Sequence, residues 1–233
     1  MEHGKPIIYV KDVRKVYRMG DEEVVALKRI NLKIYKGEVC CIFGTSGSGK
    51  STLLNQLAGM EKPTKGQVFI RGKNISYMNE EELAAFRQEH MSFIFQSYNL
   101  LPSMTAVENV AMPLMFKGMD RKTRESMAED MLKRVGLSHR LHHYPSQMSG
   151  GQQQRAGIAR AFVSRPEVVF ADEPTGNLDT KTTAEIMDMV MGFARRFNQT
   201  IILVTHDPGM SRYADRIVTL VDGIITRDER KGQ

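Results

Sequence analysis

The sequence predicts an α/β fold in which short buried strands alternate with helices. Apolar runs at 39–43, 168–171 and 201–204 have the length and composition of strands that are buried on both faces. Apolar residues at helical spacing follow the first run at 50–59 and precede the second at 152–163. At 233 residues, the chain is long enough for one substantial core and a smaller appended subdomain.

The composition is that of an ordinary globular protein. The net charge is +6, but the basic residues are interspersed with 27 acidic ones, and no long run carries a single sign. This pattern favours a solvated, mildly basic surface over a nucleic-acid-binding face. Cys40 and Cys41, the only cysteines, are adjacent, so they cannot staple distant segments as a disulfide framework does. We expect both to be buried in the first strand.

The apolar segments are too short for targeting or membrane insertion. The stretch at 7–10 falls short of a signal-peptide core, and no stretch approaches the roughly 18 apolar residues that span a bilayer. We therefore expect a cytoplasmic protein without direct membrane insertion, which reaches a membrane only through a partner.

A glycine-rich loop, GTSGSGKST at 44–52, follows the first predicted strand. Glycine has no Cβ, so such a loop folds tightly and directs successive N–H groups at an anion, and the following helix adds the positive end of its dipole. Lys50 then neutralises phosphates and the Ser51 hydroxyl ligates Mg²⁺. A loop that only turns the chain needs neither residue at those places. The sequence therefore predicts a phosphate-binding P-loop.

Polar residues also follow the other two apolar runs. Asp172 and Glu173 follow the second run, and His206 follows the third. Because ligands of an open parallel sheet bind beyond the carboxyl ends of its strands, we expect one crevice to collect these residues and the P-loop. Asp172 is then suited to hold Mg²⁺, Glu173 to polarise the attacking water and His206 to donate to the γ-phosphate. Pro174 predicts an extended Glu173. Taken alone, His206 is better explained as a contact to a nearby loop, and only the edge that it shares with the P-loop favours the functional role.

A second anion-binding helix start is predicted at Ser149, Gly150 and Gly151, before a helix that begins near Gln152. One nucleotide has no obvious need for two such sites from one chain. A head-to-tail pair of chains resolves this, because each chain then offers its second site to the other's nucleotide.

These motifs resemble those of the ATP-binding subunits of ABC transporters, and they occur in family order along nearly the whole chain. After the P-loop come a Gln-loop at Gln96 in FIFQSYNLLP, the signature at 149–152, the acidic pair at 172–173, a D-loop GNLD that ends at Asp179, and a histidine switch at His206. The signature begins with Met148 where the family usually has leucine. This exchange conserves volume and leaves the anion-binding residues intact.

The resemblance implies an α/β P-loop NTPase (RecA-like) core with an N-terminal antiparallel β region and an inserted α-helical signature subdomain. Residues 1–96 and 165–233 would form the core, and residues 97–164 the subdomain that contacts the membrane partner. ATP and Mg²⁺ would be the ligands, with Glu173, His206 and Gln96 in catalysis and Ser51, Gln96 and Asp172 at the metal. The implied ATP-binding residues are Gly44, Thr45, Ser46, Gly47, Ser48, Gly49, Lys50, Ser51, Thr52 and Tyr17.

Two further implications concern recognition of the nucleotide. The Tyr17 ring would stack on adenine, although an ordinary strand-edge tyrosine is a competing explanation. In an ATP-bound homodimer, Ser149, Gly150, Gly151 and Gln152 would contact the nucleotide of the opposite subunit.

The stretches FIFQSYNLLPSMTAVENVAMPL and ADEPTGNLD resemble the branch of macrolide and antimicrobial-peptide exporters, lipoprotein-release complexes and a cell-division regulator. The implied function is an ATP-hydrolysing subunit that powers export, lipoprotein release or transmembrane mechanical work. It would act through a separate integral membrane permease at the inner face of the cell membrane. Two alternatives remain: an ATP-dependent regulator of a membrane protein without bulk transport, and a DNA-maintenance ATPase. The second usually carries long insertions for which this chain has no room, so no nucleic-acid partner is expected.

The segment between Gln96 and the signature predicts helices at 106–118 and 123–136. Because nucleotide-sensing residues flank it at both ends, ATP binding can rotate this segment against the core. Met112, Met115 and Met119 recur near helical spacing, which suits either an adaptable permease-facing surface or plain core packing.

The cluster His139, His142 and His143 has a spacing that can hold a metal, but no cysteine accompanies it. An exposed helix end or loop is therefore the favoured interpretation.

Overall fold

The structure, a computed structural model, describes residues 4–231, with the side chain of Met19 outside that description. Internal contacts divide the chain into two compact units, Met1–Arg87 with Thr200–Gln233 and Gln88–Gln199, which we call the first and the second unit. The sequence motifs predicted other boundaries, at 96/97 and 164/165. Those boundaries separate the chain by functional motif and not by internal contacts, and they remain a prediction.

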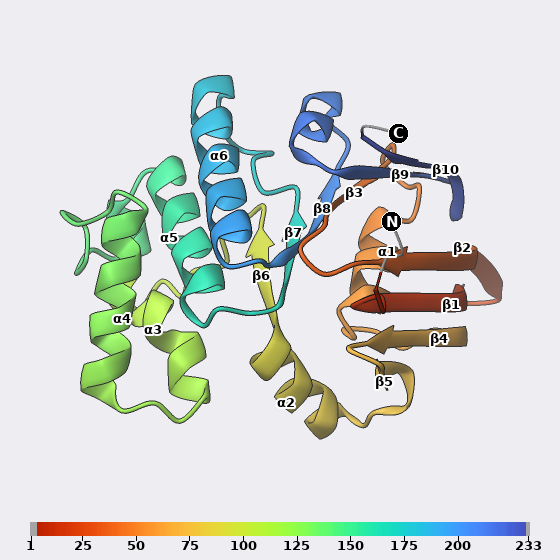
Figure 1. The fold of residues 1–233 in the computed structure, drawn as a ribbon, viewed down its shortest axis with the longest axis horizontal. Coiled ribbons are helices and arrows are strands. Elements are labelled where there is room, and N and C mark those ends of the chain that lie inside the picture. The colour runs from red at the N-terminus through yellow and green to blue at the C-terminus, as the bar shows by residue number, and fades with distance from the viewer. Residues whose placement is uncertain (1–3, 232–233) are drawn as a thin grey trace. The chain divides into compact units, whose positions relative to one another are not determined.

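An antiparallel sheet forms the N-terminal part of the first unit (Figure 1). Its strands are β1 (Ile8–Met19), β2 (Glu22–Ile34), β4 (Lys65–Ile70) and β5 (Lys73–Asn74), in the order β2-β1-β4-β5. The tight turn between β1 and β2 uses Gly20 at φ 63°, a left-handed conformation that glycine adopts without steric cost. The predicted N-terminal antiparallel region is confirmed.

The strand that leads into the P-loop also lies in the first unit. β3 (Val39–Phe43) pairs in parallel with β8 (Thr200–Thr205) and β9 (Arg216–Val221), and β9 pairs antiparallel with β10 (Ile224–Arg230). Every residue of β8 is buried, and both cysteines of β3 are buried, as expected of strands covered on both faces. α1 (Lys50–Leu57) follows β3, and two 3₁₀ segments lie at Ile75–Tyr77 and Pro208–Tyr213.

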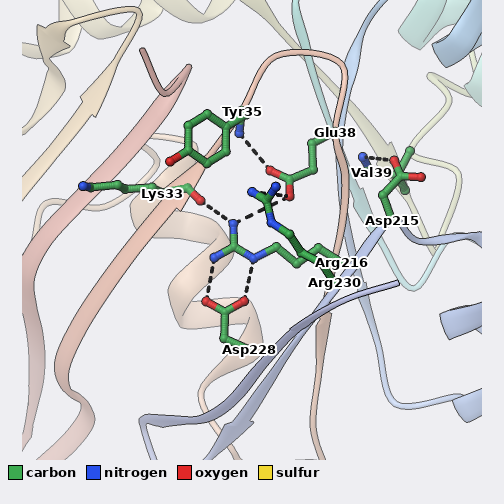
Figure 2. Close-up of polar contacts among 8 residues, drawn as sticks. All are labelled: Lys33, Tyr35, Glu38, Val39, Asp215, Arg216, Asp228 and Arg230. Atoms are coloured by element: carbon green, nitrogen blue, oxygen red, sulfur yellow. Dashed lines mark hydrogen bonds and ion pairs between the residues drawn. The ribbon is translucent and has the colours of Figure 1, made fainter. Parts of the chain in front are cut away.

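A charged cluster ties the β9–β10 hairpin to the strands beside it (Figure 2). The Arg216 guanidinium forms a bidentate pair with Asp228, at 2.5 and 2.6 Å, and donates to the Lys33 carbonyl oxygen at 2.6 Å. Glu38 lies 3.6 Å from Arg216 and 3.4 Å from Arg230. Because Arg216 is only 8% exposed, these partners replace the water that it loses on folding. The cluster joins the hairpin to β2 and to the start of β3.

Helices make up most of the second unit (Figure 1). α3 (Ala106–Phe116), α4 (Arg121–Arg134) and α5 (Gly150–Val163) pack against one another, and α5 also contacts α6 (Thr180–Arg196). β6 (Met91–Phe95) pairs in parallel with β7 (Val168–Asp172), α2 (Glu80–His90) leads into β6, and a 3₁₀ segment lies at Pro145–Gln147. Between residues 4 and 231, no helix combines the length and the apolar character needed to cross a membrane.

The helices between Gln96 and the signature were predicted with small errors at their ends. The one expected at 123–136 begins earlier, at Arg121, because the Asp120 carboxylate caps it by accepting from the Thr123 N–H at 3.0 Å. The residues at 138–144 form turns and no helix, so His139, His142 and His143 lie in a loop, one of the two placements expected for them.

Candidate functional site

The P-loop needs its glycines for both conformation and space. Gly47 and Gly49 have φ angles of 79° and 99°, which residues with a Cβ rarely adopt. A Cβ on Gly49 would lie 2.7 Å from the Ala26 carbonyl oxygen, and one on Gly44 would collide with the Leu220 carbonyl oxygen. The loop therefore packs its backbone directly on neighbouring backbone.

Lys50 crosses this loop. Its Nζ donates to the Thr45 carbonyl oxygen at 2.7 Å, and the residue is only 7% exposed although lysine is rarely buried. The helix α1 begins at Lys50, and its first intrahelical bond runs from the Leu53 N–H to the Gly49 carbonyl at 2.8 Å. A buried ammonium and a helix N-terminus thus share one small loop, which is the arrangement that binds phosphate.

Tyr17 lies in β1 beside the end of the P-loop. Its hydroxyl donates to Glu61 at 2.7 Å, and the Lys15 ammonium lies 5.1 Å from the ring centroid. Burial and the Glu61 contact raise the pKa of the Tyr17 phenol, and a hydrogen bond with Thr52 opposes them. Tyr17 is therefore in contact with the P-loop, and stacking on adenine remains a prediction.

His206 follows β8 at the same sheet edge as the P-loop. In the parallel pairing of β3 with β8, Phe43 is opposite Thr205, so Gly44 and His206 leave their strands together. The Asp207 N–H donates to the buried Thr205 hydroxyl at 3.0 Å, which fixes the turn that carries His206. The expected convergence is confirmed for these two strands, and His206 itself is exposed.

The second unit repeats this arrangement with a different pair of strands. Phe95 of β6 is opposite Asp172 of β7, so Gln96 and Glu173 follow at the same edge. Asp172 ends its strand and is partly exposed, whereas the four β7 residues before it are buried. That the edge with the P-loop and His206 and the edge with Gln96 and Glu173 form one crevice remains a prediction.

The extended conformation predicted for Glu173 is wrong. Its φ is 44°, in the left-handed region, although Pro174 follows it. Two contacts hold the turn that this conformation makes: the Gly176 N–H donates to the Glu173 carbonyl at 3.1 Å, and the buried Gln154 amide donates to the Pro174 carbonyl. A non-glycine residue in this region stores strain of about 1–3 kcal/mol, and such strain occurs often at functional sites.

Gln96 is held by the D-loop. Its Nε2 lies 3.4 Å from the Asn177 Oδ1, and the Asn177 Nδ2 donates to the Gln96 carbonyl oxygen at 3.2 Å. A Cβ on Gly176 would lie 2.7 Å from the Gln96 Nε2, so glycine leaves room for this amide. The sequence identified both motifs but gave no sign that they touch.

The signature residues form a capping box at the start of α5. The Ser149 hydroxyl accepts from the Gln152 N–H at 3.4 Å, and the Gln152 side chain accepts from the Ser149 N–H at 3.0 Å. The helix consequently begins at Gly150, ahead of the predicted start near Gln152. A Cβ on Gly151 would lie 3.2 Å from the Thr182 methyl group.

Thr182 connects the signature with the D-loop. Asp179 caps α6 by accepting from the Thr182 N–H at 3.0 Å and from its hydroxyl at 2.6 Å. These hydrogen bonds keep the pKa of Asp179 below its ordinary value. The D-loop therefore contacts Gln96 through Asn177 and lies next to the signature through Thr182.

Arg160 was missed by the sequence analysis. It donates to the carbonyl oxygens of Tyr98 and Asn99 at 2.9 and 2.5 Å, and burial lowers the pKa of its guanidinium. Tyr98 and Asn99 have φ angles of 62° and 48°, so Arg160 holds the strained turn after Gln96. A single arginine among the apolar residues of AGIARAF was the available signal.

Met112 and Met115 line a hollow of about 250 Å³ on the second unit. Met115 is 41% exposed, and the neighbouring Phe116 is 60% exposed. Met119 is not among the residues that line the hollow. The remaining lining residues are Met104, Glu108, Ala111, Arg121, Arg124 and Glu125.

Family comparison agrees with these motifs. The profile described as "ABC transporter" matches residues 27–176, which is more than half of the chain. The chain belongs to the ABC transporter family. The resemblance read from the motifs is confirmed.

Curated relatives of this ABC transporter chain are of two lengths. An uncharacterized ABC transporter ATP-binding protein of Methanocaldococcus jannaschii is 48% identical over 219 residues, which cover 94% of this chain and 97% of the relative. A macrolide export ATP-binding/permease protein MacB of Shewanella sp. (strain ANA-3) is 47% identical over 226 residues, 97% of this chain and 34% of the relative. The chain spans about a third of the length of the MacB proteins that it matches.

Solved structures match the whole fold. A dimeric, post-hydrolysis form of the ATP-binding cassette MJ0796 bound to ADP and Pi gives a TM-score of 0.89 at 41% identity, covering 96% of this chain and 98% of that one. Another dimeric structure of that bacterial ABC transporter cassette gives 0.90 at 42% identity, with the same coverage. The predicted P-loop NTPase fold is confirmed.

The residues present fit a nucleotide and Mg²⁺. Phosphate suits the Lys50 ammonium and the N-terminus of α1, which share the glycine-rich loop. Mg²⁺ prefers oxygen ligands, and the Ser51 hydroxyl of the first unit and the Asp172 carboxylate of the second are groups of that kind. In the Gln96 amide, only Oε1 can ligate a cation, because Nε2 is a hydrogen-bond donor, here to Asn177.

Proposed function

We propose that this chain is the ATP-hydrolysing nucleotide-binding subunit of an ABC transporter, which converts ATP to ADP and phosphate to drive a separate integral membrane permease. The observation that carries the proposal is the P-loop: a buried Lys50 ammonium lies across glycine backbone that no other residue type fits. Thr45, Ser46, Gly47, Ser48 and Thr52 complete the phosphate-binding segment.

The residues at the strand ends have separate tasks. Ser51, Asp172 and Gln96 would hold Mg²⁺, which would shield the charge of the phosphate oxygens. The Glu173 carboxylate accepts a proton from the attacking water as its oxygen approaches phosphorus. His206 donates to the γ-phosphate oxygens as their charge increases.

The second anion-binding helix start serves a homodimer. Ser149, Gly150, Gly151 and Gln152 of one subunit contact the γ-phosphate held by the other, which makes the complete site depend on ATP. The capping box supports this role because it fixes the start of α5 and so the direction of its N-terminal N–H groups. Tyr17 stacks on adenine.

We assign the hollow on the second unit as the docking site of the permease. Its methionines adapt to a partner, and Glu108, Arg121, Arg124 and Glu125 supply charges of both signs around them. The chain then works at the cytoplasmic face of the cell membrane. Export, lipoprotein release and mechanical signalling all use this arrangement, and the permease determines which of them applies.

Turnover of Mg-ATP by purified protein tests the assigned activity. Lys50→Ala should lower it at least about 100-fold, because the ammonium that neutralises the phosphates is lost. Lys36→Ala, which removes an exposed lysine from the same unit, should leave it unchanged. Equal turnover in wild type and Lys50→Ala, with circular dichroism showing both folded, would reject the site.

Capture from native membranes tests the partner. Tagged Glu173→Gln with Mg-ATP should retain a permease with a large extracytoplasmic domain, identified by mass spectrometry. Met115→Glu in that background should reduce the yield, and Tyr77→Glu, at a 75% exposed position of the first unit, should not. Recovery of DNA or repair factors with no membrane protein would contradict the transport role.

A further inference from the structure

The turn between β9 and β10 is hydrogen-bonded to the P-loop through backbone atoms. The Gly223 N–H donates to the Ser48 carbonyl oxygen at 3.0 Å, and the Gly223 carbonyl accepts from the Lys28 N–H at 3.0 Å. This one residue therefore links the P-loop to β2. All three segments belong to the first unit.

Glycine is required on both sides of this junction. A Cβ on Gly223 would lie 2.5 Å from the Ala26 carbonyl oxygen, the same atom that lies 2.7 Å from a Cβ on Gly49. Gly223 has φ 72° and Gly49 has φ 99°. Two glycines far apart in sequence thus let two turns approach one strand more closely than side chains allow.

The contact with Gly223 determines which way the next N–H of the P-loop points. The Ser48–Gly49 peptide is trans, so its C=O and its N–H lie on opposite sides. With the Ser48 carbonyl held on Gly223, the Gly49 N–H is directed away from the β9–β10 turn. Gly49 directly precedes Lys50, at the start of α1, where the N–H groups that bind phosphate are gathered.

The turn itself has little freedom to move. β9 pairs with β3 in parallel from Cys40 opposite Arg216 to Phe43 opposite Thr219, so the hairpin runs beside the strand that ends in the P-loop. At its far end, the bidentate pair of Arg216 with Asp228 joins the two strands of the hairpin (Figure 2). The paired strands of the hairpin consequently hold Gly223 in position.

We propose that Gly223 is a positioning residue for nucleotide binding: its N–H holds the Ser48–Gly49 peptide in the orientation that directs the Gly49 N–H at phosphate. This inference rests on the proposed phosphate-binding role of the P-loop. A phosphate-bearing ligand and the Gly223 hydrogen bond then stabilise each other, because coupling between two binding events is reciprocal.

Gly223→Ala tests this role. The added Cβ meets the Ala26 carbonyl and displaces the turn, so the KM for Mg-ATP and the Kd for ADP should both rise by about 10-fold to 100-fold, the scale of an ångström-sized misplacement. Gly72→Ala is the matched control: Gly72 has φ 77° in the β4–β5 turn, and a Cβ there meets nothing within 4 Å. It carries similar backbone strain, so it should unfold more easily while keeping both constants.

Affinities are compared at a temperature where both variants are folded by circular dichroism. An unchanged KM and Kd in Gly223→Ala would overturn the positioning role. If wild type itself binds no ATP, or Lys50→Ala binds it as well as wild type, the proposed function fails instead, so the two failures are distinct.

Amide hydrogen exchange of the wild-type protein tests the same role without a variant. Exchange of the Gly223 N–H should slow on addition of saturating ADP, whereas exchange in the β4–β5 turn at 71–72 should not change. Equal exchange of the Gly223 N–H with and without bound ADP would overturn the proposal even if Gly223→Ala does not fold.

Discussion

The side-chain amide of Asn177 bonds Gln96 twice, once to its side chain and once to its backbone carbonyl. Gln96 follows β6 and Asn177 follows β7, two strands that pair in parallel. The Gln-loop and the D-loop are therefore connected by contacts within one chain. A displacement of the D-loop would therefore move Gln96, which we propose as a ligand of Mg²⁺.

Mutation of this amide pair should give non-additive effects on turnover. Asn177→Ala and Gln96→Ala should each lower kcat for ATP, and the double variant should be little worse than Gln96→Ala. The expected coupling energy is about 0.5–3 kcal/mol, typical of residues in contact. Additive losses in kcat would show that the contact has no part in turnover.

Gly176→Ala should displace the Gln96 amide. The added Cβ would lie 2.7 Å from Nε2, and the flexible side chain is the part that gives way. We expect lower kcat with a free energy of unfolding within about 0.5 kcal/mol of wild type. Gly192→Ala is the control in α6, where a Cβ meets nothing within 4 Å. It should stabilise the helix by about 0.5–1 kcal/mol and leave kcat unchanged.

Asp228→Ala should destabilise the protein by about 1–3 kcal/mol in urea unfolding, because it removes two charge-assisted hydrogen bonds from the nearly buried Arg216. Glu229→Ala, in the same strand, removes an exposed pair with Arg227 and should change stability by less than about 0.5 kcal/mol. Similar losses in the two variants would mean that the cluster of Figure 2 adds no specific stability.

Stability should fall at alkaline pH because of the two buried thiols. Burial raises the pKa of Cys41 from 9.0 to about 12 and also raises that of Cys40. The unfolded chain loses these protons first, so stability that is present below pH 9 is lost as the pH rises from about 9 towards 12. Each thiol contributes a slope of up to about 1.4 kcal/mol per pH unit.

The double variant Cys40→Ala, Cys41→Ala should flatten this dependence in unfolding curves recorded between pH 8 and about 11. The same steepness in both proteins would assign the alkaline loss to other groups. At neutral pH, the folded wild type should also resist alkylation of its thiols.

The parts of this fold that could be predicted are those that depend on short stretches of sequence. VCCIF and IILV are short, apolar and followed by polar residues, and both form strands that pair in parallel, with their carboxyl ends side by side. In GTSGSGKST, the positive φ angles of Gly47 and Gly49 are a local requirement, whereas the close approach of Gly44 to Leu220 and of Gly49 to Ala26 is tertiary. The strand before Asp172 was found in the same way.

Tertiary contacts determine what the sequence could not reveal. The tendency of Pro174 to extend Glu173 is a local preference, and the hydrogen bonds from Gly176 and Gln154 outweigh it. Gly223 looks like an ordinary hairpin glycine in VDGII. Its importance arises from Ala26 and Ser48, which are distant in sequence.

Single-turnover hydrolysis by Glu173→Gln, alongside wild type and Glu129→Gln, tests the proposed activity most directly. The amide keeps the shape of the side chain but cannot accept the proton of the attacking water. We predict unchanged affinity for Mg-ATP, a stable ATP-bound dimer in sedimentation and hydrolysis at least about 100-fold slower than in wild type and in Glu129→Gln, which alters an acid on α4. Hydrolysis by Glu173→Gln at the wild-type rate would contradict the assignment of Glu173 and the catalytic site built around it.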